Sequence, residues 1–322
     1  MKTLNGLMKH LRDKGIDIQG SPQKRKLKNY GYYHGYKGHR FVGTATNCLN
    51  ITNFDEAIAL NEFDMSVKAL LYPCVMFVET ALKNYTLEAV LVDAHSYSLD
   101  DIFSRTLVAY RDHPKRTQGY REAMKKRLAL RSEINRLIQY NYSKNAIIDH
   151  FYNNDKSLPV WALFEVMTLG NFGVFYSCLK RSVKLNIAHD LMLPSNFDCA
   201  GLLERLIFSL KDLRNAIAHN SAVYDVRFKR AKVGGQLGQM LSAETGVKEI
   251  DFQTITDYVI LIVYLLRRMK VSKTECKQVI RGYSTSLELL RSSLKSSDYH
   301  KIVKTDARSK LRQLRQFVSD SD

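Results

Sequence analysis

Residues 199–220 read CAGLLERLIFSLKDLRNAIAHN. Leucine and isoleucine recur there at intervals of three and four residues, which is the spacing of one face of an α-helix. Asn220 and Ser221 follow the apolar run, and polar residues of this kind are typical of a helix end. The pattern therefore predicts a long helix over residues 199–218 that ends close to His219.

Helical patterns also dominate the rest of the 322-residue chain. Five prolines and 16 glycines are few for this length, which favours long helices over a turn-rich β architecture. Helices are predicted over residues 53–71, 75–92, 257–269 and 277–294, with Pro73 separating the first two. Residues 223–246 hold four glycines and are predicted to form a loop or a short hairpin. The expected fold class is all-α.

The net charge of +17 indicates a polyanionic partner, with RNA, DNA and an anionic membrane as candidates; the alternative is a merely soluble basic protein. The longest apolar run, residues 258–266, is far shorter than the roughly 20 residues of a membrane span. The N-terminus lacks the apolar run of a signal peptide. The five cysteines are odd in number and form no Cys-x-x-Cys pair, which is typical of reduced thiols. We expect a cytoplasmic protein without a membrane partner.

Two parts of the chain concentrate basic residues and are candidate RNA-binding segments. In the first, Lys24, Arg25, Lys26 and Lys28 precede the string Tyr-Gly-Tyr-Tyr-His-Gly-Tyr at residues 30–36. Aromatic rings among cations can stack on bases while the cations hold phosphates. The alternative is a solvated basic turn followed by tyrosines that pack on the N-terminal helix. In the second, the basic residues are Lys115, Arg116, Arg121, Lys125, Lys126, Arg127 and Arg131.

The string from Leu213 to Asn220 is the most informative for chemistry. Cleavage of RNA by its own 2′-hydroxyl needs a proton donor or acceptor near neutral pH, which histidine supplies. It also needs positive charge on the phosphate, which a guanidinium supplies through paired hydrogen bonds. We expect His219 to transfer protons, Arg214 to hold the phosphate, Asn215 to orient one of them and Asn220 to support the site. No metal or other cofactor is expected.

The spacing of Arg214 and His219 leaves an alternative open. Residues five apart on an ideal helix point about 140° away from each other. The two side chains converge if the helix ends near His219, or if a second subunit completes the site. Alternatively, His219 interacts with the negative end of the helix dipole and Arg214 pairs with Asp212 or Glu204.

Four blocks of sequence occur in a characteristic order. They are Lys14-Gly-Ile16 with residues 30–36; Phe63-Asp64, Leu70-Leu71 and Val78-Glu-Thr-Ala-Leu-Lys-Asn84; Pro159-Val-Trp161 with Glu165-Val-Met-Thr-Leu-Gly170; and residues 213–220. Together they resemble the abortive-infection (Abi) family of the AbiD and AbiF type, whose members are similar to HEPN-domain ribonucleases. Lys83 stands where the family more often has arginine. Glu79 either orients a catalytic group or forms an ordinary intrahelical pair with Lys83.

The resemblance implies a HEPN-like helical bundle with N-terminal and C-terminal helical extensions. The expected segments are a basic, tyrosine-rich N-terminal helical segment at 1–50, a HEPN-like core with inserted basic helices at 51–270, and C-terminal helices with a tail at 271–322. It also implies a homodimer with a composite cleft, RNA cleavage with 2′,3′-cyclic phosphate products, and growth arrest during phage infection. Some members are restrained by a small RNA, so a regulatory RNA is an expected partner beside the substrate.

Two classes of function remain. The first is an RNA endonuclease that acts as a defence toxin, and the second is a non-catalytic RNA-binding or interaction protein on the same scaffold. Both explain the charge, but only the enzyme needs His219 to be open to solvent.

Overall fold

The computed structural model describes residues 3–230 and 233–321. This part of the chain contains fifteen α-helices and one two-stranded hairpin, so the fold is all-α, as predicted. The chain divides into two compact units: unit 1 comprises residues 1–76 and 212–322, and unit 2 comprises residues 77–211. Because helices α3 (Phe54–Ala94) and α10 (Cys199–Ala218) each begin in one unit and end in the other, the chain passes between the units within helices.

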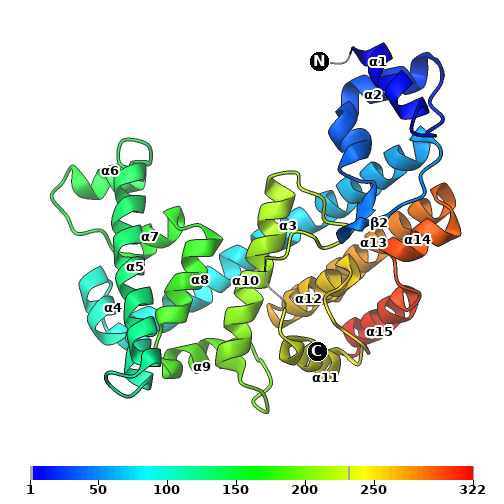
Figure 1. Cartoon of the computed structure of the whole chain (residues 1–322). Coiled ribbons are helices and arrows are strands. Elements are labelled where there is room, and N and C mark those ends of the chain that lie inside the picture. The colour runs from blue at the N-terminus through cyan, green and yellow to red at the C-terminus, as the bar shows by residue number, and fades with distance from the viewer. Residues whose placement is uncertain (1–2, 231–232, 322) are drawn as a thin grey trace. The chain divides into compact units, whose positions relative to one another are not determined.

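Unit 1 combines the two ends of the chain. Besides parts of α3 and α10 it contains α1 (Leu4–Arg12), α2 (Gly20–Tyr32), the π-helix η1 (Tyr33–Lys37), β1 (Phe41–Val42), β2 (Thr44–Cys48), α11 (Gly235–Thr245), α12 (Ile255–Arg268), α13 (Lys273–Ser293), α14 (Ser296–Ile302) and α15 (Ala307–Asp320) (Figure 1). The two strands are antiparallel.

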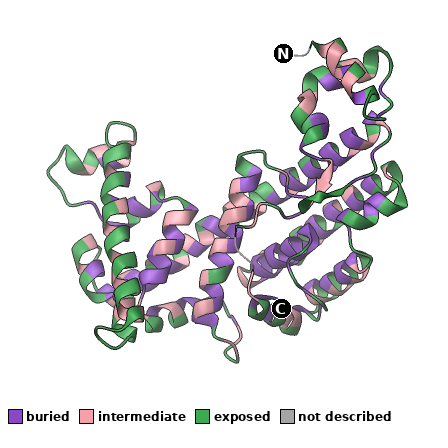
Figure 2. Ribbon diagram, viewed as in Figure 1, coloured by how far each residue is buried: buried purple, intermediate pink, exposed green. Residues whose placement is uncertain are grey.

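Helix α12 is the central helix of unit 1. Each residue from Ile255 to Arg267 is buried, and Figure 2 shows this burial along almost the whole helix. A helix that is apolar on all sides must be covered on all sides, and α11, α13 and α15 pack on it. Its one buried carboxylate, Asp257, forms an ion pair of 2.9 Å with the buried Lys310 of α15.

A second buried carboxylate, Asp64, lies on α3 and joins distant parts of unit 1. It is fully buried and lies 2.5 Å from Lys68, one helical turn further along α3. Its Oδ1 also accepts the backbone N–H groups of Val223 and Tyr224, at 2.7 and 3.0 Å. The carboxylate therefore attaches the segment that follows α10 to the N-terminal third of α3.

Unit 2 surrounds an aromatic core. Besides parts of α3 and α10 it contains α4 (Leu99–Arg105), the 3-10 helix η2 (Ala109–Asp112), α5 (Gln118–Asn141), α6 (Ala146–Tyr152), α7 (Val160–Val166), α8 (Leu169–Cys178) and α9 (Arg181–Asp190). Helix α5 packs on α7 and α8. Phe164 of α7 contacts Phe172 and Phe175 of α8 edge to face, with the ring centres 6.0 and 5.1 Å apart.

Pro73 does not separate two helices, contrary to the prediction. It lies inside the 41-residue helix α3. The proline removes one backbone hydrogen bond and costs about 3 kcal/mol in a helix interior. The buried stripe of α3 nevertheless continues across it, through Val67, Leu71, Val75 and Val78. Burial of these side chains at about 1.5–3 kcal/mol each outweighs the cost of the proline.

One part of the glycine-rich segment is helical, contrary to the prediction. Residues 235–245 form helix α11, whereas a loop or hairpin was expected there. Gly238 lies so close to the Ile250 carbonyl that a Cβ atom would be 2.1 Å from its oxygen. Gly238 is thus required for close packing of helix α11 on a backbone segment. The prediction was wrong because glycines needed for close packing give the same sequence pattern as the glycines of a loop.

Helix α3 is long and apolar enough to cross a membrane by length and composition alone. The core helices of soluble proteins pass the same test, so length and composition do not by themselves make α3 a membrane span. Two ion pairs along α3, Asp64–Lys68 and Glu79–Lys83, are better suited to a protein core than to lipid. The described residues carry no clear sign of a membrane protein.

The two units follow contacts in space, whereas the three expected segments follow changes along the sequence. The first unit holds both the expected N-terminal and C-terminal segments. The functional division at residues 50 and 270 stays a prediction.

Removal of the Asp64 carboxylate should destabilise the protein strongly. In Asp64→Ala the buried charge of Lys68 loses its carboxylate partner. Loss of one partner of a buried ion pair lowers the free energy of unfolding by about 3–5 kcal/mol. Asp55→Ala is the matched control, because Asp55 pairs with Lys26 on the exposed start of the same helix and should cost about 1 kcal/mol or less. Urea unfolding followed by circular dichroism measures both free energies. Equal costs would contradict the central role of Asp64.

Candidate functional site

Helix α10 ends next to His219, as the sequence predicted, and the His219 residue is exposed. The helix ends at Ala218, and Asn220 takes a left-handed conformation with φ of 52°. The N–H of Ser221 donates to the carbonyl of Ala216 at 2.8 Å, and that of Asn220 donates to Ile217 at 3.2 Å. This pair of bonds is the Schellman arrangement that closes a helix. His219 thus stands directly after the last residue of the helix and is exposed.

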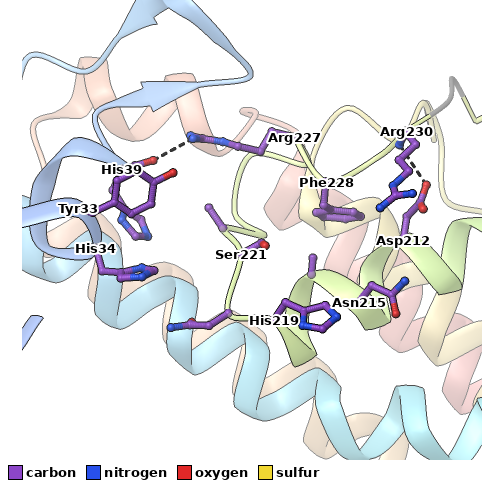
Figure 3. Close-up of a pocket in the computed structure, with 14 residues that line it drawn as sticks. Tyr33, His34, His39, Asp212, Asn215, His219, Ser221, Arg227, Phe228 and Arg230 are labelled. Atoms are coloured by element: carbon purple, nitrogen blue, oxygen red, sulfur yellow. Dashed lines mark hydrogen bonds between the residues drawn. The ribbon is translucent and has the colours of Figure 1, made fainter. Parts of the chain in front are cut away.

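A cleft of about 480 Å³ in unit 1 contains this histidine. It is lined by Tyr33, His34, Gly38, His39, Asp212, Asn215, Ala216, His219, Asn220, Ser221, Ala222, Arg227, Phe228 and Arg230. Figure 3 shows the tyrosine-rich segment on one side of the cleft and the end of α10 on the other. The two sequence blocks that carry most of the chemical signal, residues 30–36 and 213–220, therefore meet at one site.

The tyrosine-rich segment presents His34 from a π-helix. Gly31 has φ of 71°, which ends the regular part of α2, and η1 follows at Tyr33–Lys37. Single π-helical turns are rare and often occur at functional sites. Asn61 of α3 donates to the His34 carbonyl at 3.2 Å, and the Tyr33 ring contacts the His34 ring edge to face. The backbone of His34 is fixed while its side chain is exposed.

A buried network lies behind the cleft. Lys68 donates to the Asn220 side chain at 2.9 Å, so the Asp64–Lys68 pair also fixes the residue after His219. The ring of His39 stacks on Tyr224, and its Nε2 lies 3.9 Å from Asp64. Burial alone would raise the pKa of Asp64, but the interactions with His39, Lys68 and the Val223 amide outweigh it and lower this pKa.

Arg227 forms part of the cleft wall, and its guanidinium is used for structure. It donates to Asp225 at 2.7 Å, to the Gly38 carbonyl at 2.9 Å and to the Phe41 carbonyl at 2.7 Å. These bonds attach the loop after α10 to the N-terminal segment. Arg230 is exposed at the cleft and is held through its backbone N–H, which donates to Asp212 at 3.1 Å (Figure 3).

The predicted motif residues divide between the cleft and its surroundings. His219, Asn215 and Asn220 line the cleft. Arg214 is half-buried and donates to the Asn215 side chain at 3.4 Å, but it is not among the described residues that line the cleft. Of its two suggested partners, Glu204 accepts from Lys184 at 3.2 Å. The assignment of Arg214 to the phosphate stays a prediction.

Glu79 forms the intrahelical pair that the sequence allowed. It belongs to unit 2 and lies 3.2 Å from Lys83, whose ammonium also donates to the Met167 carbonyl at 2.6 Å.

The predicted RNA-binding residues differ in how free they are to bind. In unit 1, Lys26 pairs with Asp55 at 2.9 Å, while Arg25 and Lys28 are exposed and Lys24 is half-exposed. In unit 2, Arg127 donates to the carbonyls of Leu107 and Phe103 at 3.0 and 2.8 Å, so it supports the fold. The exposed members of that group are Lys115, Arg116, Arg121, Lys125 and Lys126.

Several site residues were missed from the sequence. His34 lies in a predicted RNA-binding segment but was given no chemical role, and His39 was not predicted as a site residue. Over the residues that the structure describes, no group of three or more His, Cys, Asp or Glu could hold a metal ion. Asp64 and Lys68 have the spacing of an ordinary helical pair. The contact of these residues with the end of α10 connects positions more than 150 apart in sequence, which periodicity alone does not show.

The fold and the cleft define an all-helical protein with a histidine-lined site built from its N-terminal segment and the end of a long helix. A family model described as "Abi-like protein" matches residues 25–225, and the chain therefore belongs to the Abi-like protein family. The matched range includes both His34 and His219. No curated protein and no solved structure matches the chain. Membership of this family suggests a role in abortive infection, a form of phage defence.

The contribution of Asp64 to stability should depend on pH. Its pKa is below the ordinary value of 3.8, so its stabilising effect is complete above that value and is lost as the pH falls through the lower, folded-state pKa. Asp64→Asn removes the charge but keeps an amide oxygen. The difference in free energy of unfolding between wild type and Asp64→Asn should be largest at about pH 6 and should shrink as the pH falls below 3.8 and the Asp64 carboxylate gains its proton. A difference independent of pH, measured by urea unfolding, would contradict this.

Proposed function

We propose that this Abi-like protein is a metal-independent endoribonuclease of the HEPN type that acts as a phage-defence toxin. The observation that carries the proposal is the exposed position of His219 in a cleft, beside Asn215 and opposite the tyrosine-rich segment. A histidine with a merely structural role at a helix end has no need of a cleft, whereas a proton-transfer group must reach its substrate.

The proposed reaction uses the substrate's own 2′-hydroxyl. Its oxygen attacks the adjacent phosphorus as its proton leaves to a base, and the bond from phosphorus to the 5′-oxygen breaks as that oxygen gains a proton. The products are a 2′,3′-cyclic phosphate and a free 5′-hydroxyl. The negative charge on phosphorus grows in the transition state, and guanidinium groups stabilise such charge. Arg214 is the candidate from the sequence motif. Arg230 is an exposed arginine at the cleft, and the other arginine of the lining, Arg227, already donates to Asp225 and to backbone carbonyls.

RNA is the proposed substrate, and a small regulatory RNA is the proposed restraint on the toxin. The net charge of +17 and the exposed cations of both basic segments support an RNA partner. A homodimer is proposed from the family resemblance and from the position of Arg214 outside the cleft of its own chain.

Substitution of His219 tests the proposed activity. His219→Ala should lower RNA cleavage at least about 100-fold, because a positioned acid or base contributes about 10²–10⁴-fold. Arg214→Ala should act in the same direction, and Arg214→Lys should rescue it poorly because lysine lacks the planar fork. His189→Ala is the control, since His189 is exposed outside the cleft. Cleavage of labelled RNA, with analysis of both product ends, measures the effect.

The remaining expectations follow from the role of the 2′-hydroxyl. EDTA should leave cleavage intact, and DNA should resist. Metal-dependent cleavage that yields 5′-phosphates, or full activity in His219→Ala, would contradict the assignment. RNA binding without cleavage in the wild type would favour the non-catalytic binding protein.

Exposed cations of helix α5 should control the salt dependence of RNA binding. Combined Arg121→Glu, Lys125→Glu and Lys126→Glu should weaken binding for most sequences alike, because phosphate contacts carry no sequence information. With about 0.7 counterions released per phosphate of a single strand, the loss of three contacts should flatten the slope of log affinity against log salt by about 2. Arg127 is left intact because it supports the fold.

Equal charge reversal elsewhere separates a local site from net charge. Lys248→Glu, Lys270→Glu and Arg312→Glu change the total charge by the same amount at exposed positions outside both basic segments. The same loss of affinity in both triple variants, measured by fluorescence anisotropy, would show that net charge alone attracts the RNA.

A further inference from the structure

The proposed reaction requires two proton transfers, one from the 2′-oxygen and one to the 5′-oxygen. A single histidine can perform one of them in each catalytic step. Besides His219, two other histidines line the cleft. One of them, His39, is buried, with 3% of its surface exposed, and is stacked on Tyr224. The other, His34, is exposed.

The position of His34 is built by the fold. It stands on the π-helix η1, and Gly35 next to it is buried: a Cβ there would lie 3.3 Å from that of Tyr30 and 3.7 Å from the Phe54 ring. Asn61 fixes the His34 carbonyl from α3. The ring contact with Tyr33 restricts the imidazole. Such support places the exposed ring at one side of the cleft, while His219 stands on the other (Figure 3).

We propose that His34 and His219 of the same chain are the general acid and general base of RNA cleavage. This inference rests on the proposed ribonuclease function and adds a second catalytic residue to it. One imidazole takes the proton from the 2′-hydroxyl while the O2′–P bond forms. The other, as imidazolium, gives a proton to the 5′-oxygen while the P–O5′ bond breaks. One proton enters the site's pair of histidines and one leaves, so their total charge is unchanged.

The surroundings of the cleft suit this division. The other charged or titratable side chains that line it are Tyr33, His39, Asp212, Arg227 and Arg230. Arg227 is held by Asp225 and by carbonyl groups, and the His39 ring is covered. His34 and His219 are therefore the exposed histidines among the described residues that line the cleft, and histidine is the side chain that most often serves as a general acid or base.

Two substitutions and two substrates test the proposal. His34→Ala and His34→Gln should each lower kcat/KM at least about 100-fold on ordinary RNA, and the bell-shaped pH profile of the wild type should lose one limb. A second substrate carries sulfur in place of the bridging 5′-oxygen at one linkage. A thiolate leaves without a proton, since thiols have a pKa of about 8.5. The variant that lacks the general acid should therefore cleave this substrate within about 10-fold of the wild-type rate.

The outcome assigns the roles. If only the His34 variants cleave the sulfur-containing substrate at a rate near that of the wild type, His34 is the acid. If only His219→Ala does so, His219 is the acid and His34 is the base. Both results support the pair. Wild-type cleavage of ordinary RNA by His34→Ala, or recovery by both variants or by neither, overturns it. His300→Ala is the matched control, because His300 is an exposed histidine of unit 1 with the same edge-to-face contact to a preceding tyrosine, outside the cleft. Inactivity of His219→Ala with full activity of His34→Ala would leave the proposed ribonuclease intact and remove only this inference.

Mixing of variants tests whether the pair belongs to one chain. In a mixture of His34→Ala and His219→Ala, refolded together, each chain lacks one histidine. If both histidines act within a single chain, the mixture stays as inactive as its components. If the pair formed across a dimer, one of the two sites in a mixed dimer would be intact, and activity would return. Such a return would overturn the single-chain arrangement.

Discussion

The carboxylate of Asp64 is the interaction on which the rest of unit 1 depends. Burial of an ion costs several kcal/mol, so an ion in a core must gain hydrogen bonds and an opposite charge. Lys68 and the backbone of Val223 and Tyr224 supply them here. Because these partners come from α3 and from the loop after α10, the carboxylate is satisfied only when that loop is in place. Formation of the cleft and folding of unit 1 are therefore coupled.

Side chains whose hydrogen bonds and charges are already satisfied within the protein support the structure, and exposed side chains are free to react. Arg227 donates hydrogen bonds to Asp225 and to carbonyls of the N-terminal segment, and Lys68 forms an ion pair with Asp64. A cation used in this way holds the wall of the cleft but has little left for a substrate. His34, His219 and Arg230 are among the exposed residues that line the cleft. Rigid support beneath exposed groups is what precise chemistry requires.

The sequence predicted those features that depend on interactions between residues close together in the chain. The all-α class, the end of α10 at Ala218 and the pair between Glu79 and Lys83 all follow from periodicity, helix-end residues and spacing. It failed at Pro73 and in α11, where burial of neighbouring side chains and a close backbone approach override local preference. The role of His34 in the cleft depends on a contact between segments about 185 residues apart, and a single sequence contains no direct signal of such a contact.

In the proposed enzyme, attraction and selectivity reside in different residues. The charge of +17 acts over the Debye length, about 8 Å at physiological salt, and attracts any polyanion, RNA or DNA, with little regard to sequence. The cleft acts only on a linkage whose 2′-hydroxyl can reach a histidine. DNA has no 2′-hydroxyl and is therefore not cleaved. Mutations in the basic segments should therefore change how much nucleic acid is bound, and mutations in the cleft should change what is done to it. Attraction of nucleic acid acts over a long range, so the surface cations can vary in position. Cleavage depends on local geometry, so the two histidines cannot.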